Sequence, residues 1–189
     1  MRNNYEFSNA KRNPYMTTNI KLIPLSLDHI DGIMSWVNDG EVMKYFAGHQ
    51  KEISRDEELK YIERLTASPN DKVFSIFADN KYVGQCSVNS IYWPAFNGRL
   101  FVVICKEAQG NGYGYQAIEK LLDYAWKELC LHKIWLIVRD ENKAAQAMYL
   151  RLGFSFEGFL KEEYRVNEVY FDMVRMGMIT PLPYMNEVK

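Results

Sequence analysis

A glycine-rich hexapeptide in the middle of the chain carries the residue types that bind a phosphate group. It runs Gln109-Gly110-Asn111-Gly112-Tyr113-Gly114, with an apolar run before it and a long amphipathic pattern after it. This order predicts a strand, a tight turn and a helix. Such a turn presents backbone N–H groups and the positive end of a helix dipole to an anion. We therefore expect a phosphate-bearing ligand at this loop.

Two common phosphate-binding schemes do not fit this hexapeptide. The dinucleotide fingerprint needs a third glycine where the chain has Tyr115, and a P-loop needs a terminal Gly-Lys-Ser/Thr. What remains is the pattern Q-x-x-G-x-G on Gln109, Gly112 and Gly114, whose successive amides can surround a pyrophosphate. The hexapeptide alone is also compatible with a tight turn that only begins a helix.

A second candidate group lies 28 residues beyond Gly114 and is centred on Asn142 and Tyr149. Seven residues at about 100° each bring these two side chains to within about 20° of one another on a helix. Ala145 and Leu152 share that face. Taken alone, the face is also compatible with core packing, with Tyr149 as an ordinary core tyrosine. A ligand at the glycine loop would make the same face point toward it.

Hydrophobic periodicity predicts the elements that position these groups. We predict strands over 20–25, 73–78, 82–91, 99–104, 134–138, 154–160 and 169–179, and helices over 26–37, 54–67, 117–129 and 142–152, with a short helical turn at 41–46. The run at 134–138 is almost wholly apolar, which is typical of an interior strand. These elements indicate one α/β domain with a largely antiparallel, partly parallel sheet.

Composition places the chain among ordinary globular proteins. It has 189 residues, 48% of them apolar, and a formal net charge of -1, so no basic excess points to nucleic acid. Its three cysteines lie far apart, which argues against a disulfide framework or a zinc site and favours a reducing compartment. With no membrane-length apolar run and no signal-peptide pattern, we expect a cytoplasmic protein. We assign 1–16 to a polar arm, 17–180 to the domain and 181–189 to a tail.

Taken together, these motifs resemble the GNAT acetyltransferase superfamily over roughly residues 17–179. The hexapeptide is similar to that family's pyrophosphate loop for acetyl-CoA, and Asn142 to Tyr149 followed by Gly153-Phe154 is similar to the second half of its CoA site. The branch that acetylates ribosomal-protein N-termini, polyamines and amino sugars shares further features, namely Gly158, Tyr170, Asp172 and Trp36 followed by Asn38, Asp39 and Val42. The resemblance implies a mixed, mostly antiparallel sheet flanked by helices, with a splayed cleft for acyl-CoA.

The resemblance also implies a reaction, in which an amine attacks the thioester of acetyl-CoA directly and no metal takes part. It implies that a backbone N–H between Val103 and Cys105 polarises the carbonyl group. Tyr149 would protonate the leaving thiolate, since a phenol has a pKa near ~10 and a cysteine-type thiol near ~8.5. The cofactor contacts implied are Val103, Ile104, Cys105, Gln109, Gly110, Asn111, Gly112, Tyr113, Gly114, Asn142, Ala145 and Tyr149.

The base that deprotonates the amine is left open by the sequence. Related proteins often place a glutamate early on the strand before the loop, where this chain has Arg99. The candidates that remain are Asp39, Glu41, His49, Tyr92 and Glu107. His49 and His132 have no ligand-spaced partners, so neither indicates a metal site. Cys105 has no basic neighbour in sequence that would activate a thiol, and we interpret it as a packed strand residue.

The acceptor site is expected to involve the first two helices, the 93–97 connection and the 164–170 hairpin, which are rich in aromatic residues and carry scattered acids. Such a cleft suits a cationic amine or a sugar ring. The leading hypothesis is therefore acetyl transfer to a primary amine on a polyamine, an amino sugar, an aminoglycoside or a protein N-terminus. Alternatives are a non-catalytic acyl-CoA-binding sensor and a structural or oligomerisation domain. A homodimer is also left open.

Overall fold

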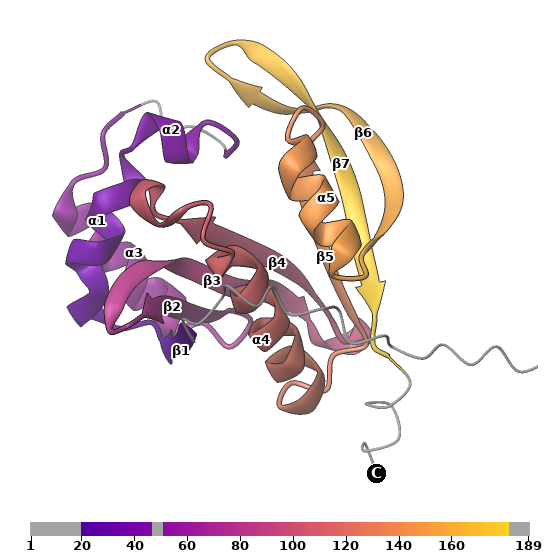
Figure 1. The fold of residues 1–189 in the computed structure, drawn as a ribbon, viewed down its shortest axis with the longest axis horizontal. Coiled ribbons are helices and arrows are strands. Elements are labelled where there is room, and N and C mark those ends of the chain that lie inside the picture. The colour runs from indigo at the N-terminus through magenta and orange to yellow at the C-terminus, as the bar shows by residue number, and fades with distance from the viewer. Residues whose placement is uncertain (1–19, 47–50, 182–189) are drawn as a thin grey trace, which may run out of the picture.

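A seven-stranded mixed sheet runs through the part of the chain that the computed structural model describes, residues 20–46 and 51–181 (Figure 1). The strand order is β1-β2-β3-β4-β5-β7-β6. Neighbouring strands are antiparallel except for β4 and β5, which confirms a mostly antiparallel sheet with one parallel step. The strands are β1 (Ile20–Pro24), β2 (Lys72–Ala78), β3 (Lys81–Tyr92), β4 (Asn97–Ile104), β5 (Lys133–Arg139), β6 (Ser155–Val166) and β7 (Val169–Ile179). The predicted arm over 1–16, the candidate base His49 and the tail beyond Pro181 lie outside the described residues.

Five α-helices connect these strands, close to where the periodicity predicts them. They are α1 (Ile30–Val37), α2 (Gly40–Met43), α3 (Arg55–Ala67), α4 (Tyr113–Lys127) and α5 (Lys143–Arg151), with short 3-10 turns η1 (Leu27–His29), η2 (Trp93–Ala95) and η3 (Lys106–Ala108). The predicted capping box at α3 is confirmed, because Ser54 accepts from the Glu57 backbone and Glu57 accepts from the Ser54 backbone at 2.9 Å. Within the described residues, no helix is long and apolar enough to cross a membrane.

The helices divide between the two faces of the sheet. Helices α4 and α5 bury their apolar sides in a core that includes Cys86 and Val88 of β3 and Leu100 of β4. Helices α1 and α3 pack in a second core with Val73 of β2 and Val103 of β4. Side chains of a strand alternate between faces. Even-numbered residues of β4 therefore face α4 and α5, and odd-numbered ones face α1 and α3.

The sheet opens between its two central strands. Strands β4 and β5 pair only where 97–99 lie beside 133–135, whereas β5 pairs with β7 along its full length. From Leu100 to Ile104, β4 therefore has β3 as a neighbour on one side and no paired strand on the other. Polar backbone groups that lack a strand partner are free to bind a ligand. This opening is the splayed region that the family resemblance implies.

Strand β6 is longer than predicted, and the difference has a local cause. The prediction ends it at Leu160, but it continues to Val166 and forms with β7 a hairpin that projects from the body of the domain (Figure 1). The register shifts between Leu160 and Tyr164, where Glu162 has a φ of 53° and donates its N–H to Asp172 at 2.7 Å. This bulge interrupts the alternation on an exposed edge strand, so the periodic signal ends before the strand does.

Candidate functional site

The glycine loop is fixed by its own side chains. Gln109 Nε2 donates to the carbonyl oxygen of Ile104 at 3.0 Å, and Asn111 Nδ2 donates to the carbonyl oxygens of Ala108 and Gln109, each at 3.2 Å. Gly110 and Gly112 have φ values of 80° and 73°, the left-handed region that favours glycine. These contacts shape the loop from the end of β4 to the first residue of α4.

The N-terminus of α4 offers free donors for an anion. The first N–H groups of any α-helix have no intrahelical partner. Within the described residues, no side chain caps α4 at Gly112 to supply one. A Cβ atom on Gly114 would lie 3.6 Å from Ile104 Cγ1 and 3.9 Å from Met148 Sδ, so the helix start lies close to both β4 and α5. Left-handed glycines and open amides at a helix N-terminus fit the pyrophosphate of CoA.

The end of β4 presents one amide to the opening in the sheet. The Cys105 N–H donates to the Val83 carbonyl oxygen of β3 at 2.9 Å. Backbone groups of successive residues point to opposite edges of a strand, so the Ile104 N–H faces away from β3, toward the gap before β5. It lies within the 103–105 region expected to polarise the carbonyl group.

Helix α5 supplies the other side of the opening. Asn142 is its N-cap, and Asn142 Oδ1 accepts from the Ala145 N–H at 3.1 Å. Tyr149 is 8% exposed and packs edge-on against Phe154, with 5.8 Å between ring centroids. Burial raises the pKa of Tyr149 to about 12, so its hydroxyl is protonated at neutral pH.

A cavity of about 1160 Å³ joins these parts. The predicted cofactor residues that line it are Val103, Ile104, Gln109, Asn142, Ala145 and Tyr149. Residues 110–114 lie beside it at the start of α4 and do not line it. Cys105 does not line it either. It is buried, its Sγ lies 3.8 Å from Ser35 Oγ, and burial raises the pKa of its thiol, which fits a packed residue better than a nucleophile.

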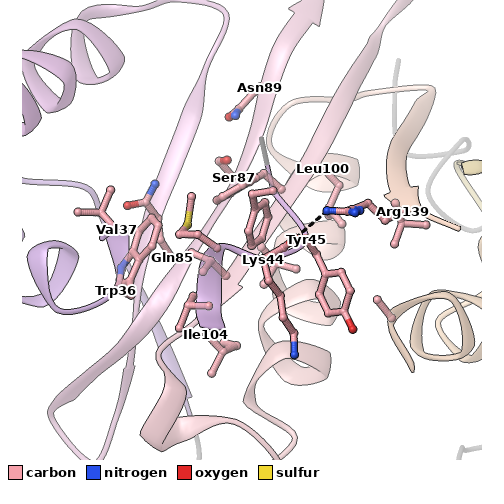
Figure 2. A pocket seen from close by; sticks show the side chains of 18 of the residues that line it. Trp36, Val37, Lys44, Tyr45, Gln85, Ser87, Asn89, Leu100, Ile104 and Arg139 are labelled. Atoms are coloured by element: carbon pink, nitrogen blue, oxygen red, sulfur yellow. Dashed lines mark hydrogen bonds between the residues drawn. The ribbon is translucent and has the colours of Figure 1, made fainter. Parts of the chain in front are cut away.

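The acceptor side of the cavity differs in part from the prediction. Helices α1 and α2 line it, as does Tyr164 of the β6–β7 hairpin, but the 93–97 connection does not. That connection is held against the start of β2 instead, because Trp93 Nε1 donates to Asn70 Oδ1 at 2.9 Å. Helix α3, the second of the predicted helices, also lines it, with residues that the sequence did not assign to the site: Glu57, Glu58, Lys60, Tyr61, Arg64 and Leu65. Figure 2 shows another part of the cavity, with Trp36 and Val37 of α1 beside Gln85 of β3.

Most of the acids considered as a base are poorly placed. Asp39 caps α2, accepting from the Glu41 and Val42 N–H groups at 2.8 Å and 3.2 Å. Glu41 lines the cavity, but it is well exposed and lies 3.7 Å from Lys44 Nζ. Neither Tyr92 nor Glu107 lines the cavity.

Glu58 is the acid that sequence reasoning missed. It lines the cavity, is 6% exposed and makes no ion pair with any described residue. Burial raises its pKa, which makes it a stronger base than an exposed carboxylate. Its neighbour Glu57 is different, because hydrogen bonds from Lys51 and Ser54 lower its pKa to about 2. The spacing of Glu58 from Ile62 and Leu65, on the apolar stripe of the helix, was the signal available in the sequence.

Arg139 links the two sides of the opening. This buried side chain of β5, 5% exposed, donates from Nη1 to the Lys44 carbonyl oxygen at the end of α2, at 2.7 Å (Figure 2). Its Nη2 lies 2.8 Å from Glu141 Oε1, and its guanidinium carbon lies 3.3 Å from the centroid of the Phe171 ring. A side chain of the β5–β7 half therefore contacts the α1–α3 half directly.

Comparison with known proteins agrees with this geometry. The family model described as the acetyltransferase (GNAT) domain matches residues 19–155. The chain belongs to this family, and it is an acetyl-CoA-dependent N-acetyltransferase.

Its relatives include spermidine N(1)-acetyltransferase of Escherichia coli (strain K12), 28% identical over 83% of this chain and 84% of that protein. The Vibrio cholerae enzyme of the same name is 28% identical over 87% of this chain and 95% of its own length. A crystal structure of spermidine N-acetyltransferase from Vibrio cholerae in complex with CoA and spermine superposes with a TM-score of 0.81 at 28% identity. It covers 88% of this chain and 98% of that one.

Proposed function

We propose that this enzyme transfers the acetyl group to a primary amine of a small polar molecule inside the 1160 Å³ cavity. One observation carries the proposal. The open end of β4, the loop residue Gln109, the Asn142 and Tyr149 face of α5 and the buried acid Glu58 all line the same space. The cofactor would enter from the α4 and α5 face of the sheet and the acceptor from the α1 and α3 face.

The chain's own residues supply three functions around the reacting atoms. Acetyl-CoA provides an activated acetyl thioester. The Ile104 N–H faces the gap between β4 and β5, where it would donate to the thioester carbonyl oxygen as negative charge develops there. The Tyr149 hydroxyl, protonated at neutral pH, would donate to the sulfur as the carbon–sulfur bond breaks.

Glu58 is proposed as the base. An alkylammonium group has a pKa near ~10 and must lose a proton before it can attack. Among the described acids of the cavity, Glu41 and Glu57 are engaged by lysines, whereas Glu58 is buried and unpaired. Such a carboxylate would bind the ammonium group of the acceptor and accept its proton, directly or through one water.

The test is release of free thiol from acetyl-CoA by the full chain over a panel of amines, with product mass confirming the N-acetyl group. Spermidine belongs in the panel because it is named for relatives, and amino sugars and a short peptide with a free N-terminus cover the other classes. Turnover with at least one amine is expected. Tight binding of CoA with no acetylation of any amine would instead favour a non-catalytic acyl-CoA sensor.

We also propose that one catalytic domain spans 17–180 and that it works in the cytoplasm. The second proposal is supported by the cysteines, since Cys86, Cys105 and Cys130 are all free thiols. Proteins of oxidising compartments more commonly pair their cysteines.

A further inference from the structure

The acceptor side of the cavity has two ends, defined by strands β3 and β4. At one end Val103 pairs with Gln85, next to the residues assigned to the thioester. At the other end Arg99 pairs with Asn89. Residues 99 and 103 are four positions apart, which corresponds to about 13 Å along a strand. Both have odd numbers, so both side chains face α1 and α3.

Helix α3 follows the same axis. Glu58 belongs to the first turn of α3, at the end of the helix opposite Asn70 and Asp71, and therefore lies toward the Val103 end. Burial is the main cause of the raised pKa of the Tyr82 hydroxyl, and the charge of Glu58 adds slightly to it. Tyr82 accepts a hydrogen bond from Trp36 at 3.0 Å and packs in the core that contains Val103. Arg64 lies six residues further along the helix, about 9 Å.

The C-terminal end of α3 leads to the Arg99 end. Just after the helix, the Asn70 carbonyl oxygen accepts from the Ile91 N–H and Asp71 Oδ1 accepts from the Ser90 N–H, both at 2.9 Å. These bonds hold the end of α3 beside the end of β3, next to the Asn89–Arg99 pair. Arg64 and Arg99 therefore lie toward the same end of the cavity.

Charge is unevenly distributed over this space. The cations that line it are Lys44, Lys51, Lys60, Arg64, Arg99 and Arg139, and the acids are Glu41, Glu57 and Glu58. Acidic partners engage three of the cations, which are Lys44, Lys51 and Arg139. Within the described ranges, Lys60, Arg64 and Arg99 form no ion pair, and Glu58 is the one lining acid without one.

The floor between the two ends is polar. Gln85, Ser87 and Asn89 point to the cavity from alternate positions of β3, and Figure 2 shows them along that strand. Asn89 Oδ1 is buried and has no hydrogen-bond partner among the described residues. A methylene chain would leave these groups unsatisfied, whereas an acceptor with hydroxyl groups would bond to them.

The free arginines are on the wrong side of the sheet to serve the cofactor phosphates. The glycine loop and α5 adjoin the even-numbered face of β4, whereas Arg99 is on the opposite face, over Trp135 at 5.8 Å from the ring centroid. Arg64 belongs to α3, on that same opposite side, and stacks over Tyr61 at 5.0 Å. Both guanidinium groups are therefore available to the acceptor.

We propose that the acceptor carries an anionic group, a carboxylate or a phosphate, as well as its amine. The amine lies at the Glu58 and Val103 end, and the anionic group is bound by Arg99 and Arg64. This inference rests on the proposed function and narrows it, because it predicts that the enzyme prefers an amine with an anionic group to a free polyamine as its acceptor substrate. Arginine is well suited to the role, since its planar guanidinium group binds both anions in a two-pronged fashion.

The test compares four acceptors that share an eight-carbon chain and a terminal amine: octanediamine, aminooctanol, aminooctanoate and aminooctyl phosphate. For the wild-type enzyme at saturating acetyl-CoA, kcat/KM is expected to be at least about tenfold higher for the two anionic acceptors than for the diamine, with the alcohol between them. The ratio of phosphate to carboxylate identifies which anion the site prefers. Added salt should reduce the preference.

Two arginine variants and a matched control assign the effect to the site. Arg99→Gln and Arg64→Gln should each raise KM for the anionic acceptors about tenfold with little change in kcat, and Arg99→Glu should make the diamine the better substrate. Lys21→Gln removes an exposed cation on β1 that does not line the cavity, and it should change nothing.

Two results would overturn the proposal: a wild-type preference for the diamine, or equal effects of Arg99→Gln on all four acceptors. Failure of the proposed function is distinguishable, because no acceptor would then be acetylated. Binding would then test the proposed anion site. With CoA present, the anionic acceptors must raise the melting temperature of the protein more than the diamine does.

Discussion

Replacing Tyr149 with phenylalanine removes one hydroxyl group and keeps the ring that packs on Phe154. None of the described residues forms a hydrogen bond with that hydroxyl, so its loss leaves no polar partner unsatisfied in the fold. The variant should therefore melt within about 2 °C of the wild type. A loss of activity in Tyr149→Phe then reports the chemistry and not the packing.

The size of the loss follows from the two acidities involved. A pKa of about 12 for Tyr149 lies roughly 3.5 units above the ~8.5 of a cysteine-type thiol, so full transfer to a finished thiolate would be uphill by about 5 kcal/mol. The phenol must therefore act while the carbon–sulfur bond is breaking and the sulfur is more basic. General acids contribute about 10²–10⁴-fold, and this mismatch places Tyr149 at the lower end, near 10² or about 2.7 kcal/mol.

The assay is thiol release at saturating acetyl-CoA from pH 6 to 10.5, with Tyr124→Phe as the control. Tyr124 is a partly buried tyrosine of α4 that packs edge-on against Phe74 and does not line the cavity. Since burial raises the pKa of Tyr149 from 10 to about 12, the wild-type profile should show no falling limb from Tyr149 below about pH 11. A Tyr149→Phe enzyme with wild-type kcat, or an equal loss in Tyr124→Phe, would refute the assignment.

Three other substitutions test separate parts of the site. Glu58→Gln should raise the melting temperature at pH 7.5 but not at pH 4, because burial raises the pKa of Glu58 in the folded protein and the ionised carboxylate therefore destabilises the fold as the pH rises above 4.5. The same variant should lower kcat at neutral pH about 10²-fold or more, and an unchanged kcat would show that Glu58 is not the base. Asn142→Ala removes the cap of α5 and should lower the free energy of unfolding by about 1 kcal/mol, or the melting temperature by roughly 2–4 °C, whereas Asn142→Asp should restore it. Equal melting temperatures for the wild type and both variants would contradict the capping role. Gly84→Ala should destabilise the fold by about 1–3 kcal/mol in chemical denaturation, because its Cβ would overlap the Val103 carbonyl oxygen, whereas Gly158→Ala meets no atom within 4 Å and should not.

Periodicity and capping patterns were sufficient to predict most of the fold. The Ser54–Glu57 capping box and the Gly153 stop were visible because they act within a few residues, and the apolar run at 134–138 marked an interior strand. The bulge at Glu162 was not visible, because the Asp172 side chain that stabilises it comes from another strand. Contacts between distant segments leave no periodic trace in the sequence.

The same limit applies to the site. Tyr149, Asn142 and Gln109 could be placed because each belongs to a local pattern, and all three line the cavity. Glu58 and Arg64 could not, since helical spacing shows only that Glu58 is on the apolar side of α3, and the packing of α3 against the sheet is what brings both residues to the cavity. The 93–97 connection was assigned to the acceptor side on its aromatic content, but a hydrogen bond from Trp93 to Asn70 draws it away.

The contact between Arg139 and the Lys44 carbonyl oxygen gives the enzyme a thermodynamic property of its own. Arg139 is the last residue of β5, which leads into the helix α5 on the cofactor side. Lys44 is the C-cap of α2, which lines the acceptor side. A ligand on one side that stabilises this contact would lower the free energy of binding for the ligand on the other side. Linkage requires the effect to be equal in both directions. Any ligand that shifts this contact would couple donor and acceptor affinities through a single guanidinium group, in the region where β4 and β5 are no longer paired.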